Sequence, residues 1–246
     1  MKKRLLVLGL AFTMFAATAC GTSSDDGNKT SKADKTVTAT PNSDKTSETQ
    51  KNDDKKDDAK ESYKSADDIT MDDLKNHEET PAEDFKYRDK SNGEAVIKEY
   101  TGDDPIVVIP NEIDGKKVVD FGKIFTNNKD IVAVRVGDNV ENIKEGAFGN
   151  CDNLKYIILG KNVKVFEHGN VGGKKFEQLE LNDGLEQLGE EGTSGAVIIL
   201  NKDKVEVKIP ESVNHMAFTG AKTLIVKAGS YAESFAKEHN MDYRVE

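Results

Sequence analysis

The side chains that most often carry out chemistry are few in this 246-residue chain, and their spacing argues against a metal centre. Its four histidines are His77, His168, His215 and His239. They are far apart, and none belongs to an H-x-x-x-H or H-E-x-x-H pattern, which would place two imidazoles on one helix face. We therefore expect no zinc site.

Nucleophiles and phosphate-binding loops are equally poorly supported. Cys151 is a candidate nucleophile, but a buried neutral thiol is inert. The glycine-rich residues 169–175 lack the G-x-x-x-x-G-K-S/T spacing of a phosphate loop, and residues 192–196 miss the G-x-S-x-G pattern. The paired carboxylates Asp103-Asp104 and Glu190-Glu191 fall in predicted turns. We expect no catalytic residue, no cofactor and no enzyme.

The first nineteen residues read as a secretory signal. Lys2, Lys3 and Arg4 precede an apolar stretch, Leu5 to Ala17, that is too short for a comfortable membrane span. The sequence Ala-Thr-Ala-Cys at 17–20 resembles a bacterial lipobox, although a lipobox usually has Leu at the position of Ala17. It also satisfies a plain Ala-x-Ala cleavage site. The resemblance implies lipidation of Cys20, with the membrane as a partner through the lipid anchor.

Charge and composition describe the next segment. Removal of the three cations of the signal changes the formal net charge from −10 to −13, which disfavours nucleic-acid binding. Residues 20–80 are mostly Ser, Thr, Asp, Lys, Asn and Glu, with too few apolar side chains to offset the entropy of folding. They are predicted to form a disordered acidic tether. A weak helix over Ala66 to His77 is conceivable there, but it would have little to pack on.

The remaining chain, residues 81–246, repeats a short apolar pattern. We aligned five units on Pro110, Gly137, Gly160, Asn182 and Pro210. We call each of these five residues the mark of its unit. The residue directly before the mark, the residue three positions before it and the residue three positions after it are apolar in every unit. A fourth column, six after the mark, holds Ile143, Phe166, Leu188 and Met216. Phe121 takes this place in the first unit, after an insertion around residues 114–117.

This spacing predicts the architecture. Apolar residues at i and i+2 make a short strand with one buried face, and the Gly, Pro or Asn ends it. One such unit cannot bury its own face, whereas stacked units can, with successive strands lying parallel. The alternative is a β-sandwich with regularly spaced turns, which gives no reason for matching columns. We predict a β-rich solenoid with few helices.

The units also resemble a known family. The stretches AVIKEYTGDDPIVVIPNEIDGKKVVDFG and VENIKEGAFGNCDNLKYIIL resemble BspA-type leucine-rich repeats, and residues 224–246 are similar to that family's terminal unit. The resemblance implies a right-handed leucine-rich-repeat solenoid on secreted or surface-anchored bacterial proteins, many credited with adhesion or with binding host proteins. It also places Cys151 at an inward, structural position. Ser230 to Glu233 form a capping box for a short helix, and residues 242–245 offer a last strand, so that residues 222–246 form a C-terminal cap.

One surface follows from the register alone. If the positions one and three before each mark face the core, those two and four before it face outward, side by side on one sheet. They form a mixed apolar, aromatic and charged surface of the kind found at interface centres. The candidate binding face comprises Val108, Arg135, Tyr156, Ile158, Gln178, Glu180, Glu206 and Lys208.

These observations favour a lipid-anchored binding module on the outer face of the bacterial cell membrane, whose ligand is an unknown protein or glycan. The alternative is a structural or envelope-assembly lipoprotein that associates with itself through the sheet or an open edge. A solute-binding lipoprotein is disfavoured, because about 165 ordered residues of repeat leave no room for two α/β lobes.

Overall fold

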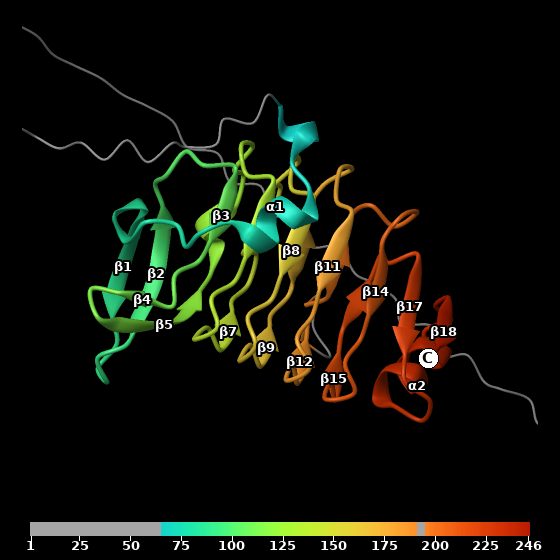
Figure 1. The fold of residues 1–246 in the computed structure, drawn as a ribbon. Coiled ribbons are helices and arrows are strands. Elements are labelled where there is room, and N and C mark those ends of the chain that lie inside the picture. Colours follow the sequence, from blue (N-terminus) through green and yellow to red (C-terminus); the bar gives the residue numbers. More distant parts are fainter. Residues whose placement is uncertain (1–64, 191–194) are drawn as a thin grey trace, which may run out of the picture. The chain divides into compact units, whose positions relative to one another are not determined.

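The computed structural model describes residues 65–190 and 195–246. The predicted signal peptide, the lipidation site Cys20 and most of the tether lie outside these residues. The described chain forms four sheets of short strands whose successive turns stack along one axis, as the repeat predicts (Figure 1).

The first sheet carries six of the eight residues of the predicted binding face. Its order is β11-β8-β6-β3, and every pair is parallel. The register places Ile106 beside Ala133, Ala133 beside Tyr156, and Tyr156 beside Gln178, as the outward column predicts. The strands are β3 (Ile106–Val108), β6 (Ala133–Arg135), β8 (Tyr156–Ile158) and β11 (Gln178–Glu180).

The second sheet closes another side of the solenoid, and two smaller sheets complete it. The second has the order β1-β2-β5-β7-β9-β12-β15 with β4 attached to β5, the third β10-β13-β16, and the fourth β14-β17-β18. The second sheet comprises β1 (Phe85–Asp89), β2 (Ala95–Tyr100), β4 (Glu112–Ile113), β5 (Lys116–Phe121), β7 (Asn142–Ile143), β9 (Val165–Phe166), β12 (Gln187–Leu188) and β15 (His215–Met216). The others comprise β10 (Gly169–Val171), β13 (Val197–Ile199), β16 (Phe218–Thr219), β14 (Glu206–Lys208), β17 (Thr223–Val226) and β18 (Tyr243–Val245).

The insertion in the first unit is a hairpin. Strands β4 and β5 pair antiparallel around Asp114 and Gly115, whose φ angles of 52° and 72° are both positive. Two such residues suit the tight turn that matches the twist of a hairpin. The insertion leaves Phe121 fully buried and paired with Ile143, as predicted.

The core lies between the sheets and consists of the predicted apolar columns. All of these positions are buried except Leu181, which is partly buried. Aromatic rings stack along the axis, with Phe125 and Phe148 5.8 Å apart between centroids and nearly parallel. Cys151 is also inward, and its thiol donates a hydrogen bond to the carbonyl of Phe125 at 2.9 Å.

Ion pairs between charged side chains recur from one turn of the solenoid to the next. Lys123 pairs with Glu145, Lys144 with Glu167, and Lys161 with Asp138, at 2.7–3.0 Å. Each pair joins residues 22 or 23 positions apart, which is one turn of the solenoid. Exposed pairs contribute little stability individually, but they favour this register over one shifted by a residue.

The C-terminal cap forms as predicted, with one exception. Helix α2 (Tyr231–Glu238) starts at Ser230, whose side chain accepts from the backbone N–H of Glu233. Ala232, Phe235 and Ala236 are buried, and β18 adds the expected last strand. The second hydrogen bond of the predicted capping box is not made, because the Glu233 carboxylate accepts from the backbone N–H of Gly229 and not from that of Ser230.

Two expectations need correction. The tether does not extend to residue 80, because residues 65–80 fold against the solenoid. They contain the short 3₁₀ helix η1 (Ala66–Asp68) and α1 (Met71–Asn76), and two further 3₁₀ turns follow, η2 (Ala82–Asp84) and η3 (Lys123–Phe125). In addition, the five outward strands do not form one sheet: β14 pairs with β17 instead of β11, because the fourth unit carries extra residues.

Candidate binding face

Residues 65–80, which we call the strap, cross the outward side of the first sheet. Helix α1 lies against β3 and β6, in front of the strands in Figure 1. Ile69 and Leu74 are fully buried there, in an apolar cluster separate from the main core. The sheet side of this cluster consists of Ile106, Val132, Ala133 and Tyr156. The outward face of the sheet is therefore apolar here, as the sequence predicts, but the strap of the same chain covers it.

The start of α1 is fixed by a capping box. Thr70 accepts from the backbone N–H of Asp73, and the Asp73 carboxylate accepts from both the backbone N–H and the hydroxyl of Thr70 at 2.7 Å. These hydrogen bonds hold the pKa of Asp73 below its ordinary value. Such a box satisfies two of the free N–H groups at a helix start, which is needed in a six-residue helix with little stability of its own.

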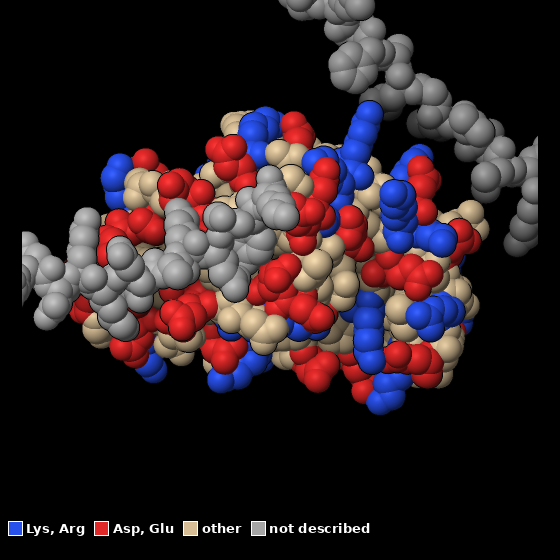
Figure 2. All heavy atoms as spheres, turned by 45° about the horizontal axis from the view of Figure 1, so that its top comes forward, with Lys and Arg blue, Asp and Glu red and all other residues tan. Residues whose placement is uncertain are grey.

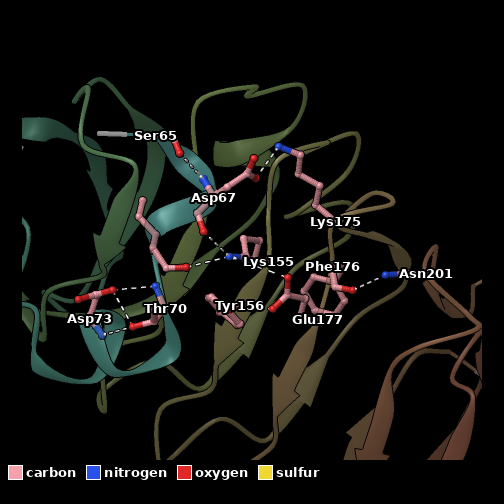
Figure 3. Close-up of polar contacts among 11 residues, drawn as sticks. Ser65, Asp67, Thr70, Asp73, Lys155, Tyr156, Lys175, Phe176, Glu177 and Asn201 are labelled. Carbon is pink, nitrogen blue, oxygen red and sulfur yellow. Dashed lines mark hydrogen bonds and ion pairs between the residues drawn. The ribbon is translucent and has the colours of Figure 1, made fainter. Parts of the chain in front are cut away.

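Lys155 anchors the strap to the sheet (Figure 3). Its side chain is only 8% exposed, and its ammonium donates to the carbonyl of Ile69 at 2.8 Å and to that of Asp67 at 3.4 Å. The same ammonium lies 5.0 Å from the ring centre of Tyr156 and 3.9 Å from the Glu177 carboxylate. A buried cation requires such partners, because its desolvation is costly.

A second set of polar contacts fixes the end of the strap. The guanidinium of Arg135 donates to the carbonyl of His77 at 2.5 Å. Thr80 lies beside the edge strand β3. Its backbone N–H donates to the carbonyl of Val108 at 3.0 Å, and its hydroxyl oxygen accepts from the Val108 N–H at 2.9 Å. Thr80 therefore supplies the hydrogen bonds that an adjacent strand would make to Val108.

Tyr156 is the most altered residue of the predicted face. The side chain is 8% exposed, and its hydroxyl donates to the Glu177 carboxylate at 2.7 Å. Burial, with this hydrogen bond second, raises the pKa of Tyr156 to about 12. The phenol thus belongs to the interface with the strap and is not available to an external ligand while the strap is bound.

The strap is acidic, and one of its carboxylates pairs with a cation of the surface beneath it. The strap carries six acidic side chains and one lysine, and the sheet and its loops present Arg135, Lys155 and Lys175 together with Glu177 and Glu180. Lys175 pairs with Asp67 at 3.0 Å, and this hydrogen bond lowers the pKa of Asp67. Elsewhere, side chains of both signs are scattered over the visible face (Figure 2).

The other half of the predicted face is open. A groove of about 510 Å³ lies where β11 and β14 are neighbours without pairing. Leu181, Pro210 and Ile225 contribute apolar surface to it. Its polar side chains are Glu177, Gln178, Glu180, Asp183, Lys204, Glu206 and Lys208.

The eight predicted face residues therefore divide into two groups. The strap buries Val108 and Tyr156, and Arg135 and Ile158 are partly buried beside it. Gln178 and Glu180 are partly exposed, and Glu206 and Lys208 are exposed, all four at the groove. Lys75 of the strap reaches Glu180 at 2.9 Å, so the area that the strap covers borders the groove.

A signal for the strap is present in the sequence. Thr70 and Asp73 have capping-box spacing, and Ile69, Met71 and Leu74 are the only strongly apolar residues in a polar segment. The expected helix over Ala66 to His77 is therefore real but shorter. Its packing surface could not be identified, because the outward column was taken to be free for a ligand.

The described residues show no catalytic arrangement. Burial raises the pKa of the Cys151 thiol to about 11, which suits a structural role and not a nucleophile. Among residues 65–190 and 195–246, no cluster of three or more His, Cys, Asp or Glu side chains could hold a metal ion. Within the same residues, no helix is long and apolar enough to cross a membrane.

Comparison with known proteins identifies the fold. No family model matches the chain, and no curated protein does. A leucine-rich-repeat protein of T. pallidum is 24% identical, with a TM-score of 0.51 over 60% of this chain and 71% of that one. A leucine-rich-repeat protein from Bacteroides capillosus ATCC 29799 is 19% identical, with a TM-score of 0.37 over 59% of this chain and 95% of that one. A leucine-rich cell surface protein from Faecalibacterium prausnitzii A2-165 is 16% identical, with a TM-score of 0.33 over 58% and 53%.

The likeness to the T. pallidum protein confirms the predicted fold class. This chain is a leucine-rich-repeat solenoid. Such a scaffold is typically used for binding, because stacked units present one extended surface built from many strands.

Proposed function

We propose that this protein is a lipid-anchored module of the BspA type that binds a protein or glycan at the cell exterior through the open half of its solenoid face. The observation that carries the proposal is the groove between β11 and β14, which gathers Gln178, Glu180, Glu206 and Lys208 beside the partly buried side chains of Leu181 and Ile225. Four residues of the predicted face thus remain accessible after the strap is in place.

The chemistry of the groove suits a polar partner with a small apolar part. Leu181 and Ile225 offer apolar contact, while the carboxylates, the amide and the lysines around them donate and accept hydrogen bonds. Several of these charges are already oriented, since Arg244 lies 3.4 Å from Glu206, and Lys208 pairs with Glu246. An oriented polar rim loses less entropy when a ligand binds.

The anchor is the second part of the proposal. The signal-like residues 1–19 and the lipobox-like residues 17–20 support attachment of acyl chains to Cys20, and two or three chains hold a protein on a membrane where one is marginal. In the producing cell, the wild-type chain is expected in the membrane fraction and labelled by radioactive palmitate. Cys20→Ser should remove both. A wild-type chain recovered unlabelled from the medium would exclude the anchor.

The binding proposal is tested by pull-down. The purified full chain is offered to host matrix proteins, host glycans and an envelope extract of the producer. The triple variant Gln178→Ala/Glu206→Ala/Lys208→Ala should lose the captured partner. Glu112→Ala/Lys117→Ala removes a facing exposed pair from the β4–β5 hairpin, and it should retain binding. A partner kept by the triple variant would refute the groove as the binding site.

One observation favours a structural role as an alternative. Strand β18 lies at the end of the fourth sheet, and Val245 on it is 48% exposed. Exposed strand edges are templates for pairing with another chain. Sedimentation that showed oligomers growing with concentration, and their loss in Val245→Lys, would support self-association through this edge.

A further inference from the structure

The surface beneath the strap has the features of a peptide-binding site that is already occupied. Ile69 and Leu74 of the strap are fully buried against the sheet, five positions apart in sequence. The ammonium of Lys155 donates to two carbonyls of the strap, and the guanidinium of Arg135 donates to a third. The sheet thus supplies two cations, an apolar strip and the edge of β3, and the strap fills all three.

The strap is attached by few buried side chains. Of its sixteen residues only Ile69, Leu74 and Thr80 are buried, and the cluster they enter is separate from the main core. Segments with few buried apolar contacts open locally at a small cost compared with global unfolding. The core columns behind the sheet do not depend on the strap, because they pack on its other side.

We propose that the outward face of β3, β6 and β8 is a binding site for an acidic peptide segment of a partner protein, and that the strap is a built-in competitor for it. The partner segment carries two aliphatic side chains five positions apart for the strip beside Tyr156. One of its acidic groups takes the place of Asp67 beside Lys175, and its backbone carbonyls bind Lys155 and Arg135, as those of the strap do. This site is distinct from the β11–β14 groove and does not rest on the function proposed for it.

The probe is a fluorescent synthetic peptide of residues 65–80, measured by fluorescence anisotropy on the full chain. A second peptide keeps only the two aliphatic and the acidic residues, with Ser elsewhere. A scrambled peptide of the first composition is the control. In the wild-type chain the strap competes from within at an effective concentration of about millimolar, so micromolar peptide should not bind.

The strap is opened by Ile69→Asp/Leu74→Asp, which removes its apolar contacts without changing the sheet. Both patterned peptides should bind this variant at least tenfold more tightly than they bind the wild-type chain, and the scrambled peptide should not. Asp72→Ser/Glu78→Ser changes two exposed strap residues and should behave as wild type. Adding Lys155→Ala to the open variant should weaken peptide binding at least tenfold, whereas adding Lys208→Ala in the groove should not.

Several outcomes would overturn the proposal. The scrambled peptide could bind the open variant as tightly as the patterned peptides do. The wild-type chain and the open variant could bind the patterned peptides with equal affinity. The patterned peptides could also fail to bind an open variant whose circular dichroism shows a folded solenoid. If the open variant does not fold, millimolar peptide is added to the wild-type chain. Displacement of the Leu74 methyl signal in its NMR spectrum supports the site, and an unchanged signal refutes it. A wild-type dimer dissolved by the peptide would assign the site to the strap of a second copy and overturn the external partner.

Discussion

The ammonium of Lys155 donates a hydrogen bond of 2.8 Å to the backbone carbonyl of Ile69, although the two residues are 86 positions apart. The contact joins β8 to a segment that precedes the first strand of the solenoid. It forms on the side of the sheet opposite the repeat core. The strap is therefore a separate layer, whose stability can be changed without changing the solenoid.

Leu74→Ala tests this separation. Truncating a fully buried leucine usually costs about 2–5 kcal/mol. Here the loss is confined to strap opening, because Leu74 belongs to the outer cluster. Amide hydrogen exchange in residues 65–80 should accelerate at least tenfold, while the thermal midpoint of the solenoid stays within about 2 °C of wild type.

Leu185→Ala is the matched control for that prediction. Leu185 is equally buried, but it lies in the main core. It should lower the free energy of unfolding of the whole domain by about 2–5 kcal/mol and accelerate exchange in every strand. If Leu74→Ala also lowers global stability by this amount, the strap is an integral part of the core.

Gly160→Ala should destabilise the solenoid. A Cβ at Gly160 would stand 2.2 Å from the carbonyl oxygen of Gly137 on the preceding turn, and neither backbone can move without separating the turns. We expect a loss of about 1–3 kcal/mol in chemical denaturation. Gly149→Ala, whose Cβ would be 3.4 Å from its nearest neighbour, should cost less than about 1 kcal/mol. Equal losses would show that close approach is not the reason for glycine at this mark.

Acid should open the strap before it unfolds the domain. The hydrogen bonds from Thr70 lower the pKa of Asp73 relative to its ordinary value of 3.8. A carboxyl group with a lowered folded pKa contributes stability that is complete above the unfolded pKa and is lost as the pH falls through the folded one. The hydrogen bond from Lys175 lowers the pKa of Asp67 as well, so this carboxyl group contributes to stability over the same pH range.

The Leu74 methyl signal should therefore shift as the pH falls below about 4. Asp73→Asn keeps the shape of the side chain but lacks its charge, so the shift of the signal in this acidic range should be smaller in the variant. An acidic shift that is as large in Asp73→Asn as in the wild-type chain would contradict this assignment.

Cys151 should be unreactive in the native state. Burial raises its pKa to about 11, so thiolate is scarce near neutral pH. In a Cys20→Ser chain Cys151 is the single thiol. A thiol reagent should label it at the rate at which the domain unfolds, and denaturant should accelerate the labelling. Labelling that increases with reagent concentration without unfolding would indicate access that the burial of this side chain does not provide.

The repeat columns were predictable because they obey a local rule. Val134, Ile157 and Leu179 alternate with outward residues on short strands, and a fixed interval stacks one strand beside the next. The buried position of Cys151 was implied by the family resemblance, and the start of α2 at Ser230 was predicted from its capping motif. The β4–β5 hairpin appears in the sequence as an insertion that still leaves Phe121 in register.

The division of the binding face could not be predicted by these rules. The solvent exposure of Tyr156 depends on a segment more than seventy positions away in the sequence. That segment, the strap, has too few apolar residues for its packing surface to be predicted. The break after Glu180 accompanies the extra residues of the fourth unit, in which β13 pairs with β10 and β16 in the third sheet. The stretch AVIILNKDKVEVKIP has two short apolar runs separated by a polar turn, which is the pattern of a hairpin. Yet β13 and β14 lie in different sheets, because each pairs in parallel with a strand of the next turn.

That break also has a mechanical consequence. Between the fourth and fifth turns, β12 remains hydrogen-bonded to β15 on one side, whereas β11 and β14 are unpaired on the other. The two turns are thus joined by the β12–β15 and β13–β16 ladders but not by the first sheet, so we expect the junction to bend most easily on the side where β11 and β14 lie. Tension along the axis should widen the unpaired side first, and a molecule lodged there would act as a wedge that sets the bend of the whole rod.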